Sequence, residues 1–183
     1  MDQGHLGFTV AANLAKFGHE VVVFEALPVA GGVLAYGIPE FRLPKCMVKR
    51  EVKRIRDLGV KIYTNIQVAK ISAVDTLIKE GFDAVFIGAG AGIPRTLGVP
   101  GESLQGIYPA NDFLMYVNLN LFYSCQEFDK KITVGKKAAI IGGGNVAIDA
   151  ARMSLRFGAK KVTMFYRRTR AEMPAAAEEI EAA

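Results

Sequence analysis

The chain has 183 residues, of which 51% are hydrophobic and 22% are charged, and its formal net charge is +5. These proportions describe a globular protein with an apolar core and exclude a disordered or fibrous chain. No apolar run reaches the roughly 18 residues that a membrane span requires. The first residues also lack the basic region of a secretory signal. We therefore expect a cytoplasmic protein that does not contact a membrane.

The first half of the chain alternates between helical and strand patterns. Apolar residues recur at helical spacing over residues 8–17, and Gly18 marks the end of that helix. Runs rich in β-branched residues predict buried strands, of which residues 20–25 form the clearest. The further predicted elements are helices over 44–58 and 74–80 and strands over 60–64, 67–71 and 83–87.

The pattern starts again after a connector, residues 109–135, which contains a helix over 110–120. The elements predicted next are a strand over 137–141, a helix over 145–157, a strand over 161–166 and a helix within 174–183 whose first turn holds Pro174. Strands that alternate with helices predict an α/β fold with parallel sheets. We expect two partial Rossmann-like units, over 1–108 and 136–183.

A glycine-rich turn connects strand and helix in the second unit. Residues 142–147 form a G-x-G-x-x-A motif, directly after a predicted strand and at the start of a predicted helix. The first glycine permits a tight turn, the second lets the backbone approach a pyrophosphate, and Ala147 stands where helix and strand pack closely. The helix N-terminus then offers N–H groups and a positive dipole end to phosphate. This context predicts nucleotide binding, and the alternative is a tight turn that binds nothing.

The residues after the next strand indicate which nucleotide binds. A site for NAD usually has an acid there that accepts a hydrogen bond from the ribose 2′-OH. This chain has Tyr166 instead, followed by Arg167, Arg168 and Arg170. Guanidinium groups bind a 2′-phosphate that a carboxylate would repel, so the pattern predicts NADPH. The alternative is a solvated basic turn.

Positive charge is concentrated around this unit. Residues 129–170 hold 11 Lys and Arg but only 2 Asp and Glu. Such a block is also typical of nucleic-acid binding. The segment lacks the interleaved aromatic residues of a recognisable RNA or DNA module, and the glycine turn explains the charge better. We therefore expect no nucleic-acid partner.

The first unit carries an incomplete version of the same motif. Gly4 and Gly7 match the second and third glycines, whereas Asp2 replaces the first and only Met1 precedes it. We therefore expect this unit to lack its leading strand and to bind its nucleotide weakly. Glu25 stands at the end of the next predicted strand, where a ribose-binding acid belongs; the alternative is a solvated strand-end acid. The two motifs form a weak internal repeat, which suggests two dinucleotide sites.

No group of residues predicts nucleophilic or metal chemistry. His5 and His19 fall in a predicted turn and at a predicted helix end, where we expect structural or exposed side chains. Cys46 and Cys125 are too few to hold an iron–sulfur cluster or a zinc ion by themselves. The expectation of no catalytic side chain fits hydride chemistry, in which the cofactors react and the protein positions them.

Four stretches of the chain resemble one known family. They are residues 23–44, 86–102, 141–152 and 166–175, which include the runs GGVLAYGIPEFRLP, FIGAGAG, GVPGE and YRR with EMPA. The chain is similar there to the glutamate synthase small (beta) subunit family of FAD- and NADPH-dependent oxidoreductases. Its relatives include a ferredoxin–NADP transhydrogenase subunit, sulfide dehydrogenase and the flavin half of dihydropyrimidine dehydrogenase.

The resemblance implies two cofactors and an electron-accepting partner. For FAD it implies contacts by Gly4, Gly7, Glu25, Gly32, Val33, Leu34, Ala89 and Gly90. For NADPH it implies contacts by Gly142, Gly144, Asn145 and Ala147, with Arg167 and Arg168 at the 2′-phosphate. A hydride would pass from the nicotinamide to the flavin, and electrons would continue to a large catalytic subunit or a ferredoxin-type partner.

The chain also departs from the family. The family has an N-terminal domain with iron–sulfur clusters and a later segment that completes the flavin site, and neither is present in this sequence. We therefore expect a fragment of a longer flavoprotein, with any iron–sulfur clusters in that missing domain or in a partner. The alternative is a truncated, non-catalytic remnant or assembly module with weak nucleotide binding.

Overall fold

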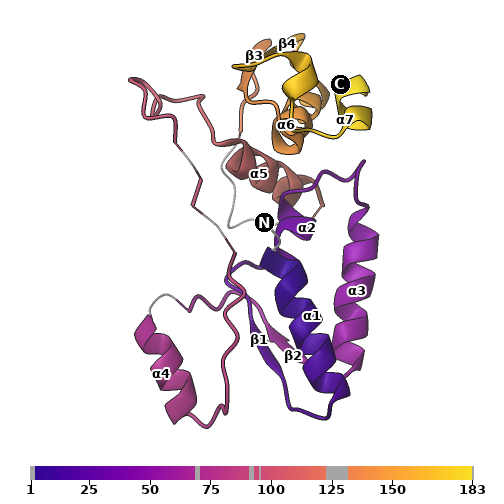
Figure 1. The fold of residues 1–183 in the computed structure, drawn as a ribbon, viewed down its shortest axis with the longest axis vertical. Coiled ribbons are helices and arrows are strands. Elements are labelled where there is room, and N and C mark those ends of the chain that lie inside the picture. The colour runs from indigo at the N-terminus through magenta and orange to yellow at the C-terminus, as the bar shows by residue number, and fades with distance from the viewer. Residues whose placement is uncertain (1–2, 69–70, 91–92, 95, 123–131, 183) are drawn as a thin grey trace. The chain divides into compact units, whose positions relative to one another are not determined.

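The computed structural model describes residues 3–68, 71–90, 93–94, 96–122 and 132–182 (Figure 1). Cys125, named above with Cys46, lies outside the described residues. The chain forms two compact units, one of residues 1–35 and 43–92 and the other of residues 36–42 and 93–183. This division differs from the expected ranges, because residues 36–42 and 93–108 belong with the second half of the chain.

A parallel strand pair lies at the centre of the first unit. In β1 (Val22–Phe24) and β2 (Lys61–Tyr63), Val22 lies opposite Lys61 and Phe24 opposite Tyr63. The helices of this unit are α1 (Gln3–Lys16), α2 (Gly32–Tyr36, which ends at the border between the units), α3 (Lys45–Asp57) and α4 (Ile71–Lys79).

The core of the first unit forms where α1, α3 and the strands meet. Val48, Val52 and Ile55 recur at helical spacing and are buried along one face of α3. Ile55 packs with Ala11 of α1 and with Val60 at the start of β2. Burial of this face places α3 beside α1, and Figure 1 shows the two helices next to the strand pair.

The second unit contains the complete strand–turn–helix–strand sequence that was predicted. Strand β3 (Lys137–Ile141) pairs in parallel with β4 (Lys161–Phe165), and α6 (Asn145–Arg156) connects them. This unit also contains α5 (Ala110–Phe122), the short 3₁₀ helix η2 (Arg170–Glu172) and α7 (Ala177–Glu181).

Helices α5 and α6 form the core of the second unit. Phe113, Leu114 and Val117 of α5 pack against Ala150 and Met153 of α6. The segment 36–42 joins this unit because the fully buried Asn118 side chain donates hydrogen bonds to the carbonyl oxygens of Tyr36 (2.6 Å) and Ile38 (3.3 Å). The predicted α/β fold with parallel strands is confirmed.

Some predicted elements are wrong. Helix α1 begins at Gln3 rather than residue 8, so Gly4, Gly7 and His5 lie inside a helix and not in a turn. Residues 83–87 have no regular structure, and Phe86 and Ile87 are exposed. A strand requires hydrogen bonds from a neighbouring strand, and the described residues provide none at this position.

Two further boundaries also differ. The strand expected over 67–71 is absent from the described residues, because residues 67–68 are irregular and α4 begins at Ile71. The last helix begins at Ala177, so Pro174 precedes it instead of occupying its first turn. Residues 170–172 form η2 instead, and this leaves Pro174 in the extended stretch between the two helices.

Candidate functional site

The glycine turn of the second unit lies between the end of β3 and the start of α6. Gly142 has φ 139°, a conformation that L side chains rarely adopt, and its N–H donates to the Phe165 carbonyl oxygen at 2.9 Å. A Cβ atom on Gly142 would lie 3.3 Å from the Ala147 Cβ. The turn therefore has the glycine and the small residue that a close strand-to-helix connection requires.

Helix α6 presents its N-terminus at this turn. Gly144 is the N-cap residue with φ −91° and ψ 171°, and no side chain within the described residues caps it. The first intrahelical bonds are donated by Ala147 and Ile148 to the Gly144 carbonyl oxygen. The preceding N–H groups have no helical acceptor, and together with the helix dipole they form an anion-binding geometry. A pyrophosphate fits the residues present here.

The side chain of Tyr166, directly after β4, packs on the glycine turn. A Cβ atom on Gly143 would lie 2.7 Å from the Cδ2 atom and 2.9 Å from the Cε2 atom of Tyr166. Real Cβ atoms do not approach other atoms so closely, so residue 143 is a glycine because the ring occupies that space. Tyr166 Oη donates a hydrogen bond of 2.9 Å to the Glu172 carbonyl oxygen.

The chain between η2 and α7 also runs along the glycine turn. Ala175 N–H donates to the Gly143 carbonyl oxygen at 3.1 Å, and Ala176 N–H donates to Asn145 Oδ1 at 2.9 Å. The second bond sets the orientation of the Asn145 amide, because its oxygen must face Ala176. Asn145 Nδ2 then remains a donor at the first turn of α6, where a phosphate oxygen could accept.

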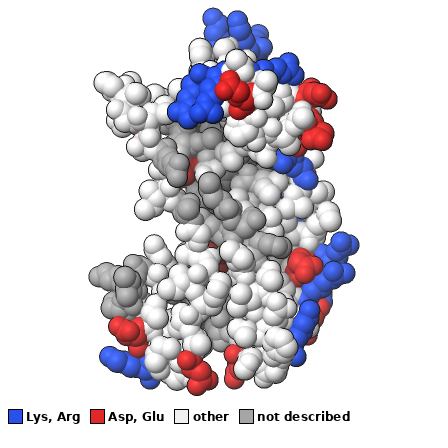
Figure 2. Space-filling model, in the orientation of Figure 1, with Lys and Arg blue, Asp and Glu red and all other residues white. Residues whose placement is uncertain are grey.

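The arginines that were predicted to read a 2′-phosphate follow Tyr166. Arg167, Arg168 and Arg170 are exposed. Arg168 and Arg170 line a hollow of about 460 Å³ that Met164 and Ile148 also line. Figure 2 shows Lys and Arg side chains gathered at the end of this unit that carries β3 and β4.

A capping box holds the turn that follows these arginines. Glu172 Oε2 accepts hydrogen bonds from the Thr169 backbone N–H (3.1 Å) and from Thr169 Oγ1 (2.9 Å). These bonds lower the pKa of Glu172 below its ordinary value, the backbone bond contributing most. The carboxylate is therefore ionised at neutral pH and keeps η2 formed.

In the first unit, the structure brings together two of the regions implied in FAD binding. The position of a Cβ on Gly88 lies 3.5 Å from both the N and the Cα of Gly7. Residues 86–88 therefore pass the first turns of α1, and Ala89 and Gly90 follow directly and are exposed. Gly90 has φ 65°, which favours glycine. Gly4 lies in the first turn of α1.

Glu25 follows β1 directly, as predicted. Its Oε1 atom accepts a hydrogen bond of 3.0 Å from the Leu27 N–H, and its own N–H donates to the Tyr63 carbonyl oxygen. Burial raises the pKa of the Glu25 carboxyl, while backbone hydrogen bonds from Leu27 and Ala26 oppose that rise. Both backbone donors lie in the local turn, and a carboxylate can accept more hydrogen bonds than these two, so a ribose hydroxyl could still donate to Glu25.

The residues implied to lie near the flavin form α2, with Val33 and Leu34 partly buried. Gly31 (φ 138°) and Gly32 (φ 53°) permit the turn into this helix, and a Cβ on Gly31 would lie 2.9 Å from Val48 Cγ1. The buried Lys45 donates from Nζ to the Leu34 carbonyl oxygen at 3.0 Å. Gly31 and Lys45 were not among the predicted site residues, although Gly31 is part of the run GGVLAYGIPEFRLP that carries the resemblance.

A charged cluster between residues 41–42 and the helices α6 and α7 was also missed. Arg42 contacts Asp149 at 2.8 Å and Glu179 at 2.9 Å, and Arg152 contacts Glu179 at 2.6 Å. Asp149 is 3% exposed, and its Oδ1 has no hydrogen-bond partner among the described residues. Burial, more than any other influence, raises the pKa of Asp149, and the hydrogen bond from Arg42 opposes this.

An aromatic ring completes this cluster. The guanidinium carbons of Arg152 and Arg156 each lie 4.1 Å from the centre of the Phe41 ring. The cluster therefore attaches residues 41–42 to α6 from its second turn to its end. No sequence pattern connects residues 107 positions apart, such as Arg42 and Asp149.

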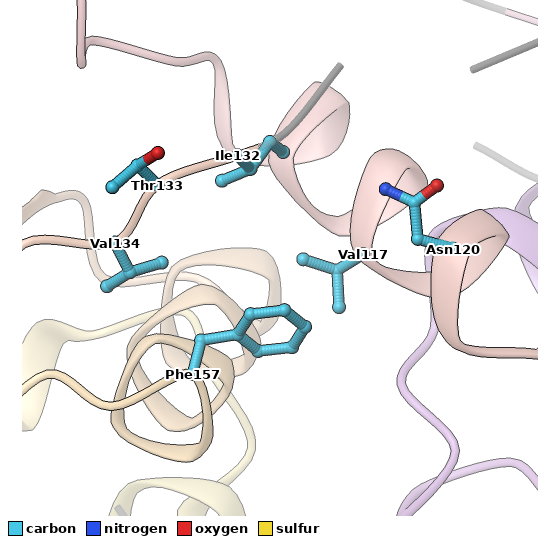
Figure 3. Close-up of a pocket in the computed structure, with 6 residues that line it drawn as sticks. All are labelled: Val117, Asn120, Ile132, Thr133, Val134 and Phe157. Atoms are coloured by element: carbon cyan, nitrogen blue, oxygen red, sulfur yellow. The ribbon is translucent and has the colours of Figure 1, made fainter. Parts of the chain in front are cut away.

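A cavity of about 410 Å³ in the second unit contains none of the predicted site residues (Figure 3). It is lined by Val117, Asn120, Ile132, Thr133, Val134 and Phe157. These side chains are mostly apolar and none is titratable, so the cavity offers no group for acid–base chemistry.

The described residues contain no group of three or more His, Cys, Asp or Glu side chains placed to hold a metal ion. None of their helices is long and apolar enough to cross a membrane.

The comparison with known proteins defines the class. A model of the pyridine nucleotide-disulphide oxidoreductases matches residues 3–183, and the chain belongs to this family. It is 44% identical to the beta subunit of an NADP(+)-dependent formate dehydrogenase from Moorella thermoacetica over 97% of the chain and 24% of that protein. It is 34% identical to the small chain of an NADPH glutamate synthase from Halomonas elongata over 97% of the chain and 38% of that protein. The expected resemblance to glutamate synthase small chains is confirmed.

Solved structures confirm the fold. FprA of Mycobacterium tuberculosis, determined in complex with NADPH, aligns with a TM-score of 0.74 and 23% identity over 97% of this chain and 44% of that protein. The chain spans less than half the length of this structure and of the curated relatives named above.

Proposed function

We propose that the chain provides the nucleotide-binding part of an NADPH-dependent flavin oxidoreductase similar to the glutamate synthase small chain. The observation that carries the proposal is the glycine turn of the second unit, which places the uncapped N-terminus of α6 beside a loop with Arg167 and Arg168. The N-terminus of α6 suits a pyrophosphate, and the arginines of the loop suit a 2′-phosphate.

In this proposal the turn and α6 bind the part of NADPH that is common to both pyridine nucleotides. Gly142 and Gly144 let the backbone approach the pyrophosphate, and Ala147 keeps the helix close to β3. Asn145 Nδ2 donates to a phosphate oxygen. Arg167 and Arg168 bind the 2′-phosphate, which NADH lacks.

The first unit binds FAD in the same proposal. Gly4, Gly7 and Glu25 would contact its pyrophosphate and ribose. Residues 32–34, with 89–90, would lie near the flavin. Bound flavin and nicotinamide supply hydride transfer. The chain's own residues bind and orient the two groups.

Electrons would leave the flavin for a partner. The named relatives include a beta subunit and a small chain, and such names belong to enzymes with other subunits. We therefore propose that a large catalytic subunit or a ferredoxin-type protein receives the electrons.

One observation favours a second candidate, a non-catalytic or assembly role with weak flavin binding. Phe86 and Ile87, which were predicted to lie in a buried strand, are 55% and 70% exposed. The region implied to close over FAD is thus poorly packed within the first unit, and a loosely held segment orients a cofactor poorly.

Two measurements on the purified chain test these candidates, one for the NADPH site and one for the flavin site. Calorimetric titration should show tighter binding of NADP⁺ than of NAD⁺, because only NADP⁺ offers a phosphate to the arginines. Reconstitution with FAD followed by gel filtration should leave little flavin absorbance, because the first unit holds the cofactor weakly. Equal affinities for the two nucleotides would contradict the NADPH site. Stoichiometric retention of FAD would contradict the second candidate.

A further inference from the structure

On the basis of the proposed NADPH site, we propose that Tyr166 is a positioning residue for recognition of the 2′-phosphate. It holds the loop that carries the arginines at a fixed place beside the glycine turn. The side chain lies where a site for NAD would have an acid, and it has two separate contacts to nearby backbone.

The first contact is between the Tyr166 ring and the backbone of Gly143. The distances of 2.7 to 3.0 Å from a Cβ position on Gly143 to three ring atoms leave no room for any other residue there. The ring is partly buried by this contact. The start of the loop, directly before Arg167, is therefore fixed against the turn.

The second contact is the hydrogen bond from Tyr166 Oη to the Glu172 carbonyl oxygen. It closes a loop of residues 166–172, which contains Arg167, Arg168 and Arg170. The capping box between Thr169 and Glu172 closes the inner part of the same loop. The Tyr166–Glu172 hydrogen bond and the capping box together limit the backbone conformations that the loop with the arginines can adopt.

The loop is attached again on its far side. The hydrogen bonds from Ala175 to Gly143 and from Ala176 to Asn145 lead the chain back to the glycine turn. The arginines thus lie between two attachments to the turn that would hold the pyrophosphate. A fixed distance between turn and arginines matters because one ligand must reach both.

A change at Tyr166 should affect the two nucleotides differently. NADP⁺ and NAD⁺ share the pyrophosphate, so both depend equally on the glycine turn. Only NADP⁺ depends on where the loop places the guanidinium groups. Removal of the Tyr166 hydroxyl should therefore weaken NADP⁺ binding more than NAD⁺ binding.

The test is calorimetric titration of the full chain and of Tyr166→Phe with both nucleotides. We expect the Kd for NADP⁺ to rise about three- to tenfold and the Kd for NAD⁺ to change less than about twofold, as for loss of one hydrogen bond. Tyr108→Phe is the matched control, since Tyr108 lies outside the site and is 40% exposed. It should leave both affinities unchanged.

A double-mutant cycle with Arg168→Ala asks whether Tyr166 acts through the arginines. In the Arg168→Ala background, Tyr166→Phe should change NADP⁺ affinity less than about twofold. A general role in folding would instead give the same loss in both backgrounds, together with a lower melting temperature and equal losses for the two nucleotides. That outcome would overturn the inference.

The proposed function and this inference fail in different ways. A wild-type chain without preference for NADP⁺ would contradict both. A clear wild-type preference that Tyr166→Phe leaves unchanged would contradict the inference alone.

Discussion

At the scale of single residues, the NADPH proposal depends on two kinds of side chain, a charged arginine and a neutral amide. Arg168 is exposed and carries a full charge, whereas Asn145 offers one amide whose orientation the Ala176 N–H determines. The positive charge of an arginine at the 2′-phosphate raises the affinity for NADPH alone, because NADH has no such phosphate. A hydrogen-bond donor at the pyrophosphate raises the affinity for both nucleotides. Substitutions at the two positions should therefore have different signatures.

Replacement Arg168→Ala should weaken NADPH binding about 10- to 100-fold and leave NADH binding nearly unchanged, because one charge-assisted hydrogen bond is lost. Fluorescence titration with both nucleotides measures this. Lys160→Ala is a suitable control, because it removes an exposed positive charge from the same unit without touching the loop. Equal losses for the two nucleotides would show that Arg168 supports the fold and does not bind the phosphate.

Replacement Asn145→Asp should weaken NADPH and NADH by similar factors, on the order of tenfold. The aspartate still accepts from Ala176, but it loses the Nδ2 donor and places a negative charge beside the phosphates. Thermal unfolding should not be impaired, since an acid at a helix N-terminus is favourable. A selective loss of NADPH alone would contradict the assignment of Asn145 to the shared pyrophosphate.

At the scale of elements, the β3–α6 connection fixes the start of α6 and the Arg42 cluster fixes its middle. The glycine turn determines how the helix leaves the sheet. The cluster attaches the middle of the helix to residues 41–42 and to α7 through Asp149, Arg152 and Glu179. The stability of this unit can therefore be tested at two features: the turn conformation that only glycine adopts easily, and the buried charge in the cluster.

The variant Gly142→Ala should lower the free energy of unfolding by about 1–3 kcal/mol, because φ 139° is strained for alanine and the new Cβ meets Ala147 at 3.3 Å. Urea unfolding followed by circular dichroism measures the change. Gly135→Ala is the control, because that glycine has no positive φ and its Cβ would make an ordinary 3.5 Å contact. Equal stabilities of the two variants would contradict the strain argument.

The variant Asp149→Asn tests the buried carboxyl through pH. Since burial raises the pKa of Asp149 above its ordinary value of 3.8, the folded state binds this proton more tightly than the unfolded state. The free energy of unfolding of the wild type, minus that of the variant, should then fall as pH rises from 3.8 through the folded-state pKa of Asp149. Above that pKa the difference should stay constant. Urea midpoints of both proteins between pH 3 and 7 give the difference. A difference that grows with pH would mean that attraction to Arg42 outweighs burial.

At the scale of the whole molecule, the predictions succeeded where one continuous stretch contains all the signals. The second unit was predicted from its β-branched runs, its three glycines and the periodicity of 145–157, and β3, α6 and β4 match within a residue or two. The first unit was predicted less well. Its α1 begins five residues early, and 83–87 is not a strand.

The sequence by itself determined the class of fold, the glycine turn and the basic residues after β4, because each depends on neighbours along the chain. Only the tertiary structure decided that Tyr166 packs on Gly143, that Arg42 pairs with Asp149, and that residues 36–42 belong to the second unit. These contacts join residues that lie far apart in the sequence. Packing and ion pairing depend on distance in space, which periodicity and spacing do not encode.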